Sequence, residues 1–261
     1  MTILYLKEKM MIIHTFEDGG RTLAAKMRLE RELPFFGIKE CIILPIPSSR
    51  DGVTLSGCDV SLEAVANMTG EGILTVGYAI PEGIKSSIKN KGGMVYDASL
   101  DEEFLVGNAE LTAIAAIGLL LTTERRVPAD MTFGIVGYGR IGRELVRHLL
   151  FLGASLRVFT TRREVRLLLS EFGVATSEST SGADLSHIDV LINTAPARIF
   201  DTDTTYFPRE LRIMDLASGN NFPESLSIES YPSIPARMYP ESSGYLLAER
   251  AISYVEGLYR K

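Results

Sequence analysis

A glycine-rich turn between an apolar run and an amphipathic segment constrains the fold of this chain more than any other feature. Residues 133–136, FGIV, are a short apolar run of strand type, and GYGRIG follows at once at 137–142. Apolar residues between 145 and 152 recur at helical spacing, and Gly153 is placed to end that helix. Since LRVF at 156–159 predicts another strand, the segment is typical of a strand–turn–helix–strand unit.

The glycines of this turn have the GxGxxG spacing of dinucleotide sites, in the strand-to-helix context that gives the pattern its value. Gly137 allows the tight turn, Gly139 lets a pyrophosphate approach the backbone, and Gly142 lets the helix pack close to the strand. Free N–H groups and the helix dipole favour phosphate at the helix start. An ordinary turn without a ligand is the alternative. The predicted phosphate-binding residues are Gly137, Tyr138, Gly139, Arg140, Ile141 and Gly142.

The end of the second strand indicates which dinucleotide binds. An NAD site usually has Asp or Glu there, about 20 residues after the glycines, to bind the ribose 2′-hydroxyl. This chain has Thr160-Thr161-Arg162-Arg163, and its first carboxylate, Glu164, falls in the next predicted helix. Because a guanidinium pairs with phosphate in a two-pronged geometry, we predict that Thr161, Arg162 and Arg163 hold the 2′-phosphate of NADP, in preference to NAD. A solvated basic helix start is the alternative.

Composition fits a globular enzyme-sized protein. The 261 residues are 46% hydrophobic and 23% charged, enough for two modest domains. A net charge of −6 argues against nucleic acid as a partner. Cys41 and Cys58 are expected as reduced thiols in a cytoplasmic protein. No signal peptide is expected, and the most apolar segment, Leu111–Leu121, is too short to span a bilayer.

Strands and helices alternate on both sides of the glycine turn, which predicts the α/β class. We expect two Rossmann-like parallel α/β domains with a cleft between them, linked by a long hinge helix that Asn108 caps. The expected domains are an N-terminal substrate-side domain at 1–107, an NADP domain at 108–240 and a C-terminal helix at 241–261 that packs back on the first. A homo-oligomer is expected. Strands are predicted at 10–15, 41–45, 73–76, 94–96, 133–136, 156–159, 188–192 and 212–216, and helices at 21–33, 62–68, 81–89, 108–123, 164–172 and 244–259.

Ligands of parallel sheets bind outside the carboxyl ends of the strands. Two such ends in the second half of the chain, INTAP at 192–196 and DLAS at 215–218, are expected to border the nicotinamide. None of the histidines, His14, His148 and His187, falls at such an end, which argues against a hydroxyacid dehydrogenase with a histidine acid–base. No metal cluster is expected. The predicted nicotinamide residues are Asn193, Thr194, Pro196 and Ala217.

From about Cys41 onward the chain resembles the dipicolinate synthase A-subunit family, the Rossmann-type proteins that make the dipicolinic acid of bacterial spores. INTAP and DLAS in this order are more specific to that resemblance than the glycine loop is. The features that carry it are ILP at 43–45, Asn108 and Thr112 in the long helix, the loop at 137–142, TTRR at 160–163, INTAP at 192–196 and DLAS at 215–218.

The resemblance implies NADP-dependent oxidation of dihydrodipicolinate, a lysine-pathway intermediate, to dipicolinate during sporulation. It also implies that the partner is a flavoprotein-like second subunit. Since aromatising a dihydropyridine is strongly driven, hydride transfer needs little acid–base assistance, and no catalytic residue is assigned. The residues expected to hold the carboxylates of a small dicarboxylate substrate are Ser48, Ser49, Asn108, Thr112 and Ser218.

The chain departs from the family pattern in three places. Its N-terminus is shorter, Ile114 replaces an acidic residue, and Glu241 stands where a lysine is expected. A lysine would attract a dicarboxylate and a glutamate would repel it. The cofactor site is therefore expected to be kept while the substrate site has changed. Two alternatives stay open: a non-catalytic NADP-binding subunit or sensor, and a dehydrogenase for another small carboxylic acid.

Overall fold

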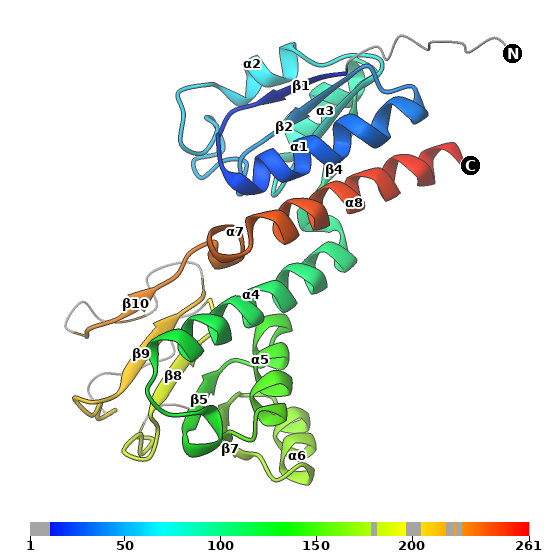
Figure 1. Ribbon diagram of the computed structural model, residues 1–261. Coiled ribbons are helices and arrows are strands. Elements are labelled where there is room, and N and C mark those ends of the chain that lie inside the picture. The colour runs from blue at the N-terminus through cyan, green and yellow to red at the C-terminus, as the bar shows by residue number, and fades with distance from the viewer. Residues whose placement is uncertain (1–10, 179–181, 197–204, 218–221, 223–225, 261) are drawn as a thin grey trace, which may run out of the picture. The chain divides into compact units, whose positions relative to one another are not determined.

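The computed structural model describes residues 11–178, 182–196, 205–217, 222 and 226–260. The chain forms two compact units. Unit 1 is Met1–Gly107 together with Tyr239–Lys261, and unit 2 is Asn108–Met238. Helix α4, Glu102–Thr123, begins in the first unit and continues into the second (Figure 1).

Unit 1 contains a parallel sheet of order β1-β2-β3-β4. The strands β2, β3 and β4 are mainly apolar and largely buried, as expected of parallel strands covered on both faces, whereas the residues of β1 are exposed or only partly buried. A 3₁₀ turn at Leu33–Phe36 lies between the first two strands, and another at Ala98–Leu100 follows the last strand of the sheet. The elements are β1 (Ile12–Thr15), α1 (Gly20–Glu32), β2 (Glu40–Ile43), α2 (Leu62–Asn67), β3 (Ile73–Gly77), α3 (Glu82–Asn90), β4 (Met94–Asp97) and, from the other end of the chain, α8 (Pro240–Tyr259).

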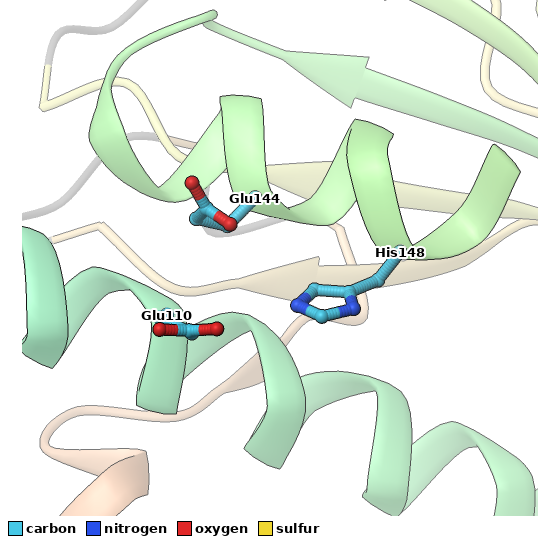
Figure 2. Close-up of side chains that lie close together, drawn as sticks. All are labelled: Glu110, Glu144 and His148. Carbon is cyan, nitrogen blue, oxygen red and sulfur yellow. The ribbon is translucent and has the colours of Figure 1, made fainter. Parts of the chain in front are cut away.

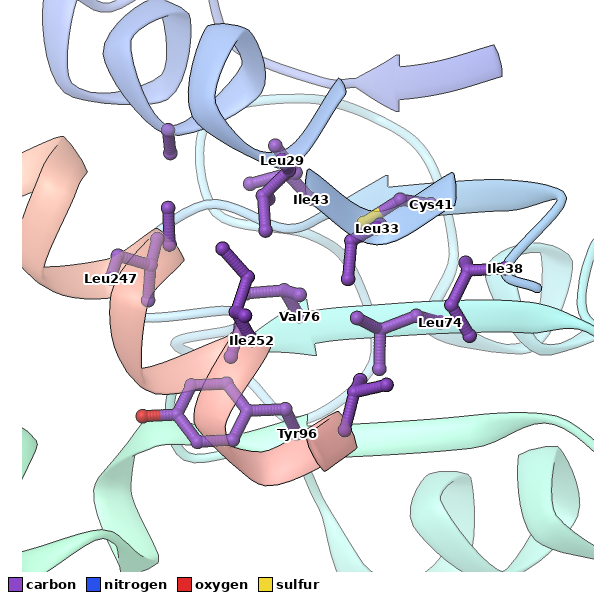
Figure 3. Packing of buried hydrophobic residues seen from close by; sticks show 14 of the residues in the cluster. Leu29, Leu33, Ile38, Cys41, Ile43, Leu74, Val76, Tyr96, Leu247 and Ile252 are labelled. Carbon is purple, nitrogen blue, oxygen red and sulfur yellow. The ribbon is translucent and has the colours of Figure 1, made fainter. Parts of the chain in front are cut away.

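The core of unit 1 has two sides because successive strand residues point to opposite faces. Cys41 and Ile43 join the cluster with Leu29 of α1 and Leu247 of α8, which Figure 3 shows. Ile42 belongs to the second cluster, with residues of α2 and α3. The alternation along β2 therefore places α1 and α8 on one face and α2 and α3 on the other.

Helices α1 and α8 approach closely, and a glycine makes this possible. A Cβ at Gly244 would lie 2.3 Å from the carbonyl oxygen of Arg21 and 2.7 Å from Cβ of Ala24. Both distances are too short for any side chain. The residue is thus required by helix packing, not by a turn.

Unit 2 contains a parallel sheet of order β10-β9-β8-β5-β6-β7. Numbered from the first strand of the unit, this is the 3-2-1-4-5-6 order of the classic dinucleotide-binding fold. The expected class, two Rossmann-like parallel α/β sheets, is confirmed. The elements are β5 (Thr132–Val136), α5 (Arg140–Phe151), β6 (Ser155–Phe159), α6 (Arg163–Glu171), β7 (Ala175–Ser177), β8 (Val190–Asn193), β9 (Arg212–Asp215), β10 (Glu229–Ser230) and α7 (Ile234–Met238), with a 3₁₀ turn at Pro128–Asp130.

The start predicted for the long helix is wrong. Helix α4 begins at Glu102, and the residue that caps it is Asp101, whose Oδ1 accepts the N–H groups of Glu103 at 3.0 Å and Phe104 at 3.2 Å. Asn108 lies inside the helix. Acidic residues near a helix start are stabilised by the helix dipole, so Glu102 and Glu103 begin the helix, and the apolar residues 104–106 continue it.

Within the described ranges, α4 is also the one helix long and apolar enough to cross a membrane, because the apolar segment at 111–121, itself too short to do so, is part of this longer helix. A buried helix in a globular core meets the same criterion. Length and composition alone therefore do not place α4 in a membrane.

The last helix also starts earlier than predicted. The segment PESSG at 240–244 is the first turn of α8, with Pro240 in the position that suits proline and Glu241 in the first turn. The short elements β7, β10 and α7 were not predicted, because two to five residues carry too little periodicity to detect.

Candidate dinucleotide site

The turn between β5 and α5 has the shape that its glycines predict. Gly137 has a φ of +88°, in the left-handed region that favours glycine. A Cβ at Gly142 would lie 2.2 Å from the carbonyl oxygen of Gly137, so the first turn of α5 rests directly on the loop. Glycine is therefore required at 137 by the backbone conformation and at 142 by close packing, whether or not a ligand binds.

Gly139 differs from these two glycines because no described residue fills the space beside it. A Cβ there would meet no described atom within 4 Å. Gly139 is also the residue before α5, and neither a side-chain cap from it nor an acidic residue in the first turn occupies the helix start. An uncapped helix start of this kind leaves backbone N–H groups to bind an anion such as a pyrophosphate. The structure brings the predicted residues 137–142 together around this position.

Thr194, directly after β8, holds the glycine turn in place. Its hydroxyl donates to the carbonyl oxygen of Val136 at 2.9 Å, and its N–H donates to the same oxygen at 2.9 Å. A Cβ at Gly137 would come within 2.9 Å of this hydroxyl. Thr194 is therefore engaged with the loop and serves to position it.

The ends of β8 and β9 are joined by buried polar side chains. Asn193 is fully buried, and its Nδ2 donates to Oδ1 of Asp215 at 2.9 Å and to the carbonyl oxygen of Ala195 at 3.2 Å. The same Asp215 oxygen accepts the N–H of Ala217 at 3.1 Å. Asn193 thus shapes the strand ends, while Pro196 is exposed and Ala217 partly exposed. Asp215 was not predicted as a site residue, although a charged residue ending an apolar strand was a visible signal.

Arginines gather at the carboxyl end of β6. The guanidinium of Arg162 donates to the carbonyl oxygen of Tyr138 in the glycine turn. Arg163 is the first residue of α6, is exposed, and has no ion-pair partner among the described residues. Thr161 is exposed beside them. The structure therefore brings the predicted 2′-phosphate residues to the same edge as the predicted pyrophosphate residues.

Arg166 belongs to the same edge and was missed. Its Nη1 donates to the carbonyl oxygens of Thr160 at 2.8 Å and Thr161 at 2.9 Å, and its Nη2 lies 3.0 Å from Oε2 of Glu178. Arg166 follows Arg162 by one helical turn, a spacing that could have indicated a shared face.

The predicted substrate residues of unit 1 are occupied by internal bonds. Ser48 is fully buried, and its Oγ accepts the N–H of Tyr78 at 2.9 Å. The hydroxyl of Ser49 donates to Asp51 at 2.9 Å. The N–H groups of Thr54 and Val53 and nearby hydroxyls hold the pKa of the Asp51 carboxyl well below its usual range. Ser48 and Ser49 therefore shape a loop instead of presenting open donors.

The two predicted substrate residues of the long helix, Asn108 and Thr112, are bonded to each other within α4. Thr112 is buried and its hydroxyl donates to the carbonyl oxygen of Asn108 at 2.7 Å, a bond within α4. Asn108 itself is partly exposed. Ser218 lies outside the described residues.

Figure 2 shows a cluster that the sequence did not predict, formed by Glu110 of α4 with Glu144 and His148 of α5. One ligand atom from each lies within 4.8 Å of the others. A cation already balances these groups, since Nη2 of Arg147 is 3.1 Å from Glu110, 2.6 Å from Glu144 and 3.2 Å from Nε2 of His148. We assign this cluster to packing of α4 against α5 and not to a metal.

A parallel sheet of this order behind a glycine turn defines unit 2 as a Rossmann-type α/β unit, and unit 1 is a smaller parallel α/β unit. No family model matches the sequence. No curated protein matches it either.

Solved structures do match. The A subunit of dipicolinate synthase from Bacillus halodurans gives a TM-score of 0.71 and 19% identity over 94% of this chain and 96% of its own. Its counterpart from Bacillus subtilis gives 0.72 and 16% over 95% and 96%. A putative NAD-binding D-isomer specific 2-hydroxyacid dehydrogenase from Polaromonas gives 0.57 and 12% over 96% and 97%. At these identities the likeness shows the fold, and the expected resemblance to the dipicolinate synthase A-subunit family is confirmed at that level.

Proposed function

We propose that the protein is an oxidoreductase that uses a nicotinamide dinucleotide, NADP in preference to NAD, and acts as the A subunit of dipicolinate synthase does. The observation that carries the proposal is the glycine turn of unit 2. Other atoms of the protein fill the space that a Cβ would need at Gly137 and Gly142, whereas no described atom lies within 4 Å of a Cβ placed at Gly139, just before a helix. A turn that needed glycine only for its own packing would not leave that position open.

Different residues of unit 2 fit different parts of the cofactor. The N–H groups at the start of α5 would bind the pyrophosphate, and Thr161, Arg162 and Arg163 would bind the 2′-phosphate. Asn193 and Thr194 would fix the strand ends beside the nicotinamide through their bonds to Asp215 and the loop. When bound, NADP⁺ would supply the hydride acceptor.

The proposed substrate is dihydrodipicolinate. Its oxidation to dipicolinate transfers one hydride to NADP⁺ and releases one proton to solvent, and the gain of aromaticity drives the step. No residue of the chain is assigned as an acid or base. We propose a flavoprotein-like second subunit, a homo-oligomeric state, and a cytoplasmic location, where the free thiols of Cys41 and Cys58 stay reduced.

A non-catalytic NADP-binding subunit or sensor is the second candidate. It is favoured by the substrate-side hydroxyls, because those of Ser48 and Thr112 are buried and bonded within the chain. Glu241 in the first turn of α8, where the resemblance places a lysine, points the same way. A dehydrogenase for another small carboxylic acid is the remaining alternative, and a panel of such acids would reveal it.

Turnover separates these functions. Freshly generated dihydrodipicolinate is mixed with the protein and NADP⁺, with and without a flavoprotein-like partner, and NADPH and dipicolinate are both followed. The proposal expects equal amounts of the two products. If neither forms in either mixture while NADPH binds tightly, the chain is a cofactor-binding protein and not the enzyme.

A further inference from the structure

Glu178 lies beside the end of β6, although 18 residues of sequence separate it from Thr160. It follows β7 directly, and β7 pairs with β6 so that Ser177 lies opposite Phe159. The N–H of Thr160 donates to the carbonyl oxygen of Ser177 at 3.0 Å, which extends the pairing one step beyond the strands. The residues that follow these two in the sequence are Thr161, after β6, and Glu178, after β7. Glu178 therefore stands at the edge where Rossmann proteins distinguish a ribose hydroxyl from a phosphate.

Arg166 links Glu178 to that edge. Its guanidinium holds the carbonyl oxygens of Thr160 and Thr161 and reaches Oε2 of Glu178 at 3.0 Å. The Arg166 side chain is 19% exposed and that of Glu178 is 70% exposed. The charge of Arg166 is thus balanced by a solvent-accessible carboxylate, whereas Arg163 has no ion-pair partner in the described part of the chain.

We propose that Glu178 is a specificity determinant that opposes the 2′-phosphate and so lowers the preference for NADP over NAD. This rests on the proposed function. A 2′-phosphate at Thr161–Arg163 would carry up to two negative charges next to this carboxylate, and like charges repel. It would also compete with Glu178 for Arg166, since both are acceptors for one guanidinium. The ribose of NAD has an uncharged hydroxyl at this position, so Glu178 neither repels it nor competes with it for Arg166.

The test is a titration of NADPH and NADH binding, followed by nucleotide fluorescence, on the full-length wild type and Glu178→Gln. Glutamine keeps the size and an acceptor for Arg166 but removes the charge. We expect NADPH to bind about 5-fold more tightly and NADH to be unchanged, as for a partly screened pair of charges. The gain should shrink at about 1 M salt, where the screening length is about 3 Å.

Two variants calibrate the result. Glu171→Gln makes the same charge change at the far end of α6 and should leave both affinities unchanged. Arg163→Ala removes the unpaired cation and should weaken NADPH about 10-fold with little effect on NADH.

The proposal is overturned if Glu178→Gln leaves NADPH affinity unchanged, because the charge would then have no effect. It is also overturned if the substitution weakens NADPH binding, because the ion pair would then support the phosphate site. Weaker NADH binding alone would also overturn it, since Glu178 would then be a ligand of the ribose hydroxyl. A wild type that binds neither nucleotide would refute the proposed function and this inference together. Binding of both nucleotides by the wild type, with no response to Glu178→Gln, would refute the inference alone.

Discussion

At the scale of single residues, the three glycines of the turn have separable roles. Gly142 is needed because a Cβ would strike the carbonyl oxygen of Gly137 at 2.2 Å. Gly139 has room for a Cβ and a φ of −81°, which alanine adopts without strain. Glycine is therefore needed at 142 for packing within the protein, and at 139 for the approach of a ligand.

These roles predict opposite outcomes for two alanine substitutions. Gly142→Ala should lower the free energy of unfolding by roughly 1–3 kcal/mol, as overpacking does, and abolish NADPH binding. Gly139→Ala should leave stability within about 0.5 kcal/mol, as at sites away from packed contacts, and still weaken NADPH binding at least 10-fold, because the methyl group occupies the pyrophosphate position. Chemical denaturation and nucleotide titration measure both. If Gly139→Ala binds NADPH normally, the turn is not a phosphate site.

At the scale of elements, the start of α4 depends on the carboxylate of Asp101, whose two oxygens have different partners. Oδ1 of Asp101 caps the helix, while Oδ2 accepts the Tyr96 hydroxyl and Nε of Arg250, each at 2.9 Å. Burial alone would raise the pKa of Asp101. The bonds from Arg250, the Phe104 N–H and Tyr96 outweigh burial and hold that pKa below its ordinary 3.8. Asp101 thereby ties α4, β4 and α8 together within unit 1.

This arrangement predicts a specific pH dependence. A carboxyl whose pKa is depressed by folding stabilises the native state fully above its unfolded pKa, and loses that stabilisation as pH falls through the folded pKa. Wild type should therefore lose stability below about pH 4. Asp101→Asn should be about 1–3 kcal/mol less stable at pH 7 and show a shallower decline in acid. Urea midpoints from pH 7 to pH 3 would show this, and parallel curves would contradict it.

The same scale shows what could be predicted from sequence. Apart from the short β7 and β10, the strands of both sheets and the glycine turn were predicted, because their apolar runs are bounded by glycine and proline. The start of α4 was not, since an acidic cap before a polar first turn looks like loop sequence. Glu178 was missed for a different reason, because strand pairing and not closeness in sequence brings it to the end of β6. Likewise, no pattern reveals that the hydroxyl of Ser48 is used by Tyr78.

At the scale of the whole molecule, unit 2 is continuous in sequence and unit 1 is assembled from two segments. Helix α8 contributes Leu247, Ala248, Ala251, Ile252 and Val255 to the core of unit 1. The predicted phosphate residues, in contrast, all belong to unit 2. Damage to α8 should thus affect the stability of one unit and spare the nucleotide site of the other.

Ile252→Ala tests this division. The side chain is 5% exposed, so its truncation should cost about 2–5 kcal/mol of unfolding free energy. Leu258→Ala, on the same helix at 44% exposure, should cost much less. Thermal unfolding and NADPH titration of both variants give the answer. Equal destabilisation by the two, or loss of NADPH binding by folded Ile252→Ala, would contradict it.

The two-segment arrangement of unit 1 also affects how the chain is made. All strands of unit 2 leave the ribosome before α8 does, so unit 2 can fold while the N-terminal sheet still lacks α8, one of the two helices that cover the same face. At roughly 5–20 residues per second, this interval is on the order of 10 s. During that time the apolar surface around Ile43 and Val76 awaits α8. We therefore expect the nascent N-terminal sheet to expose part of its apolar core surface until α8 is made.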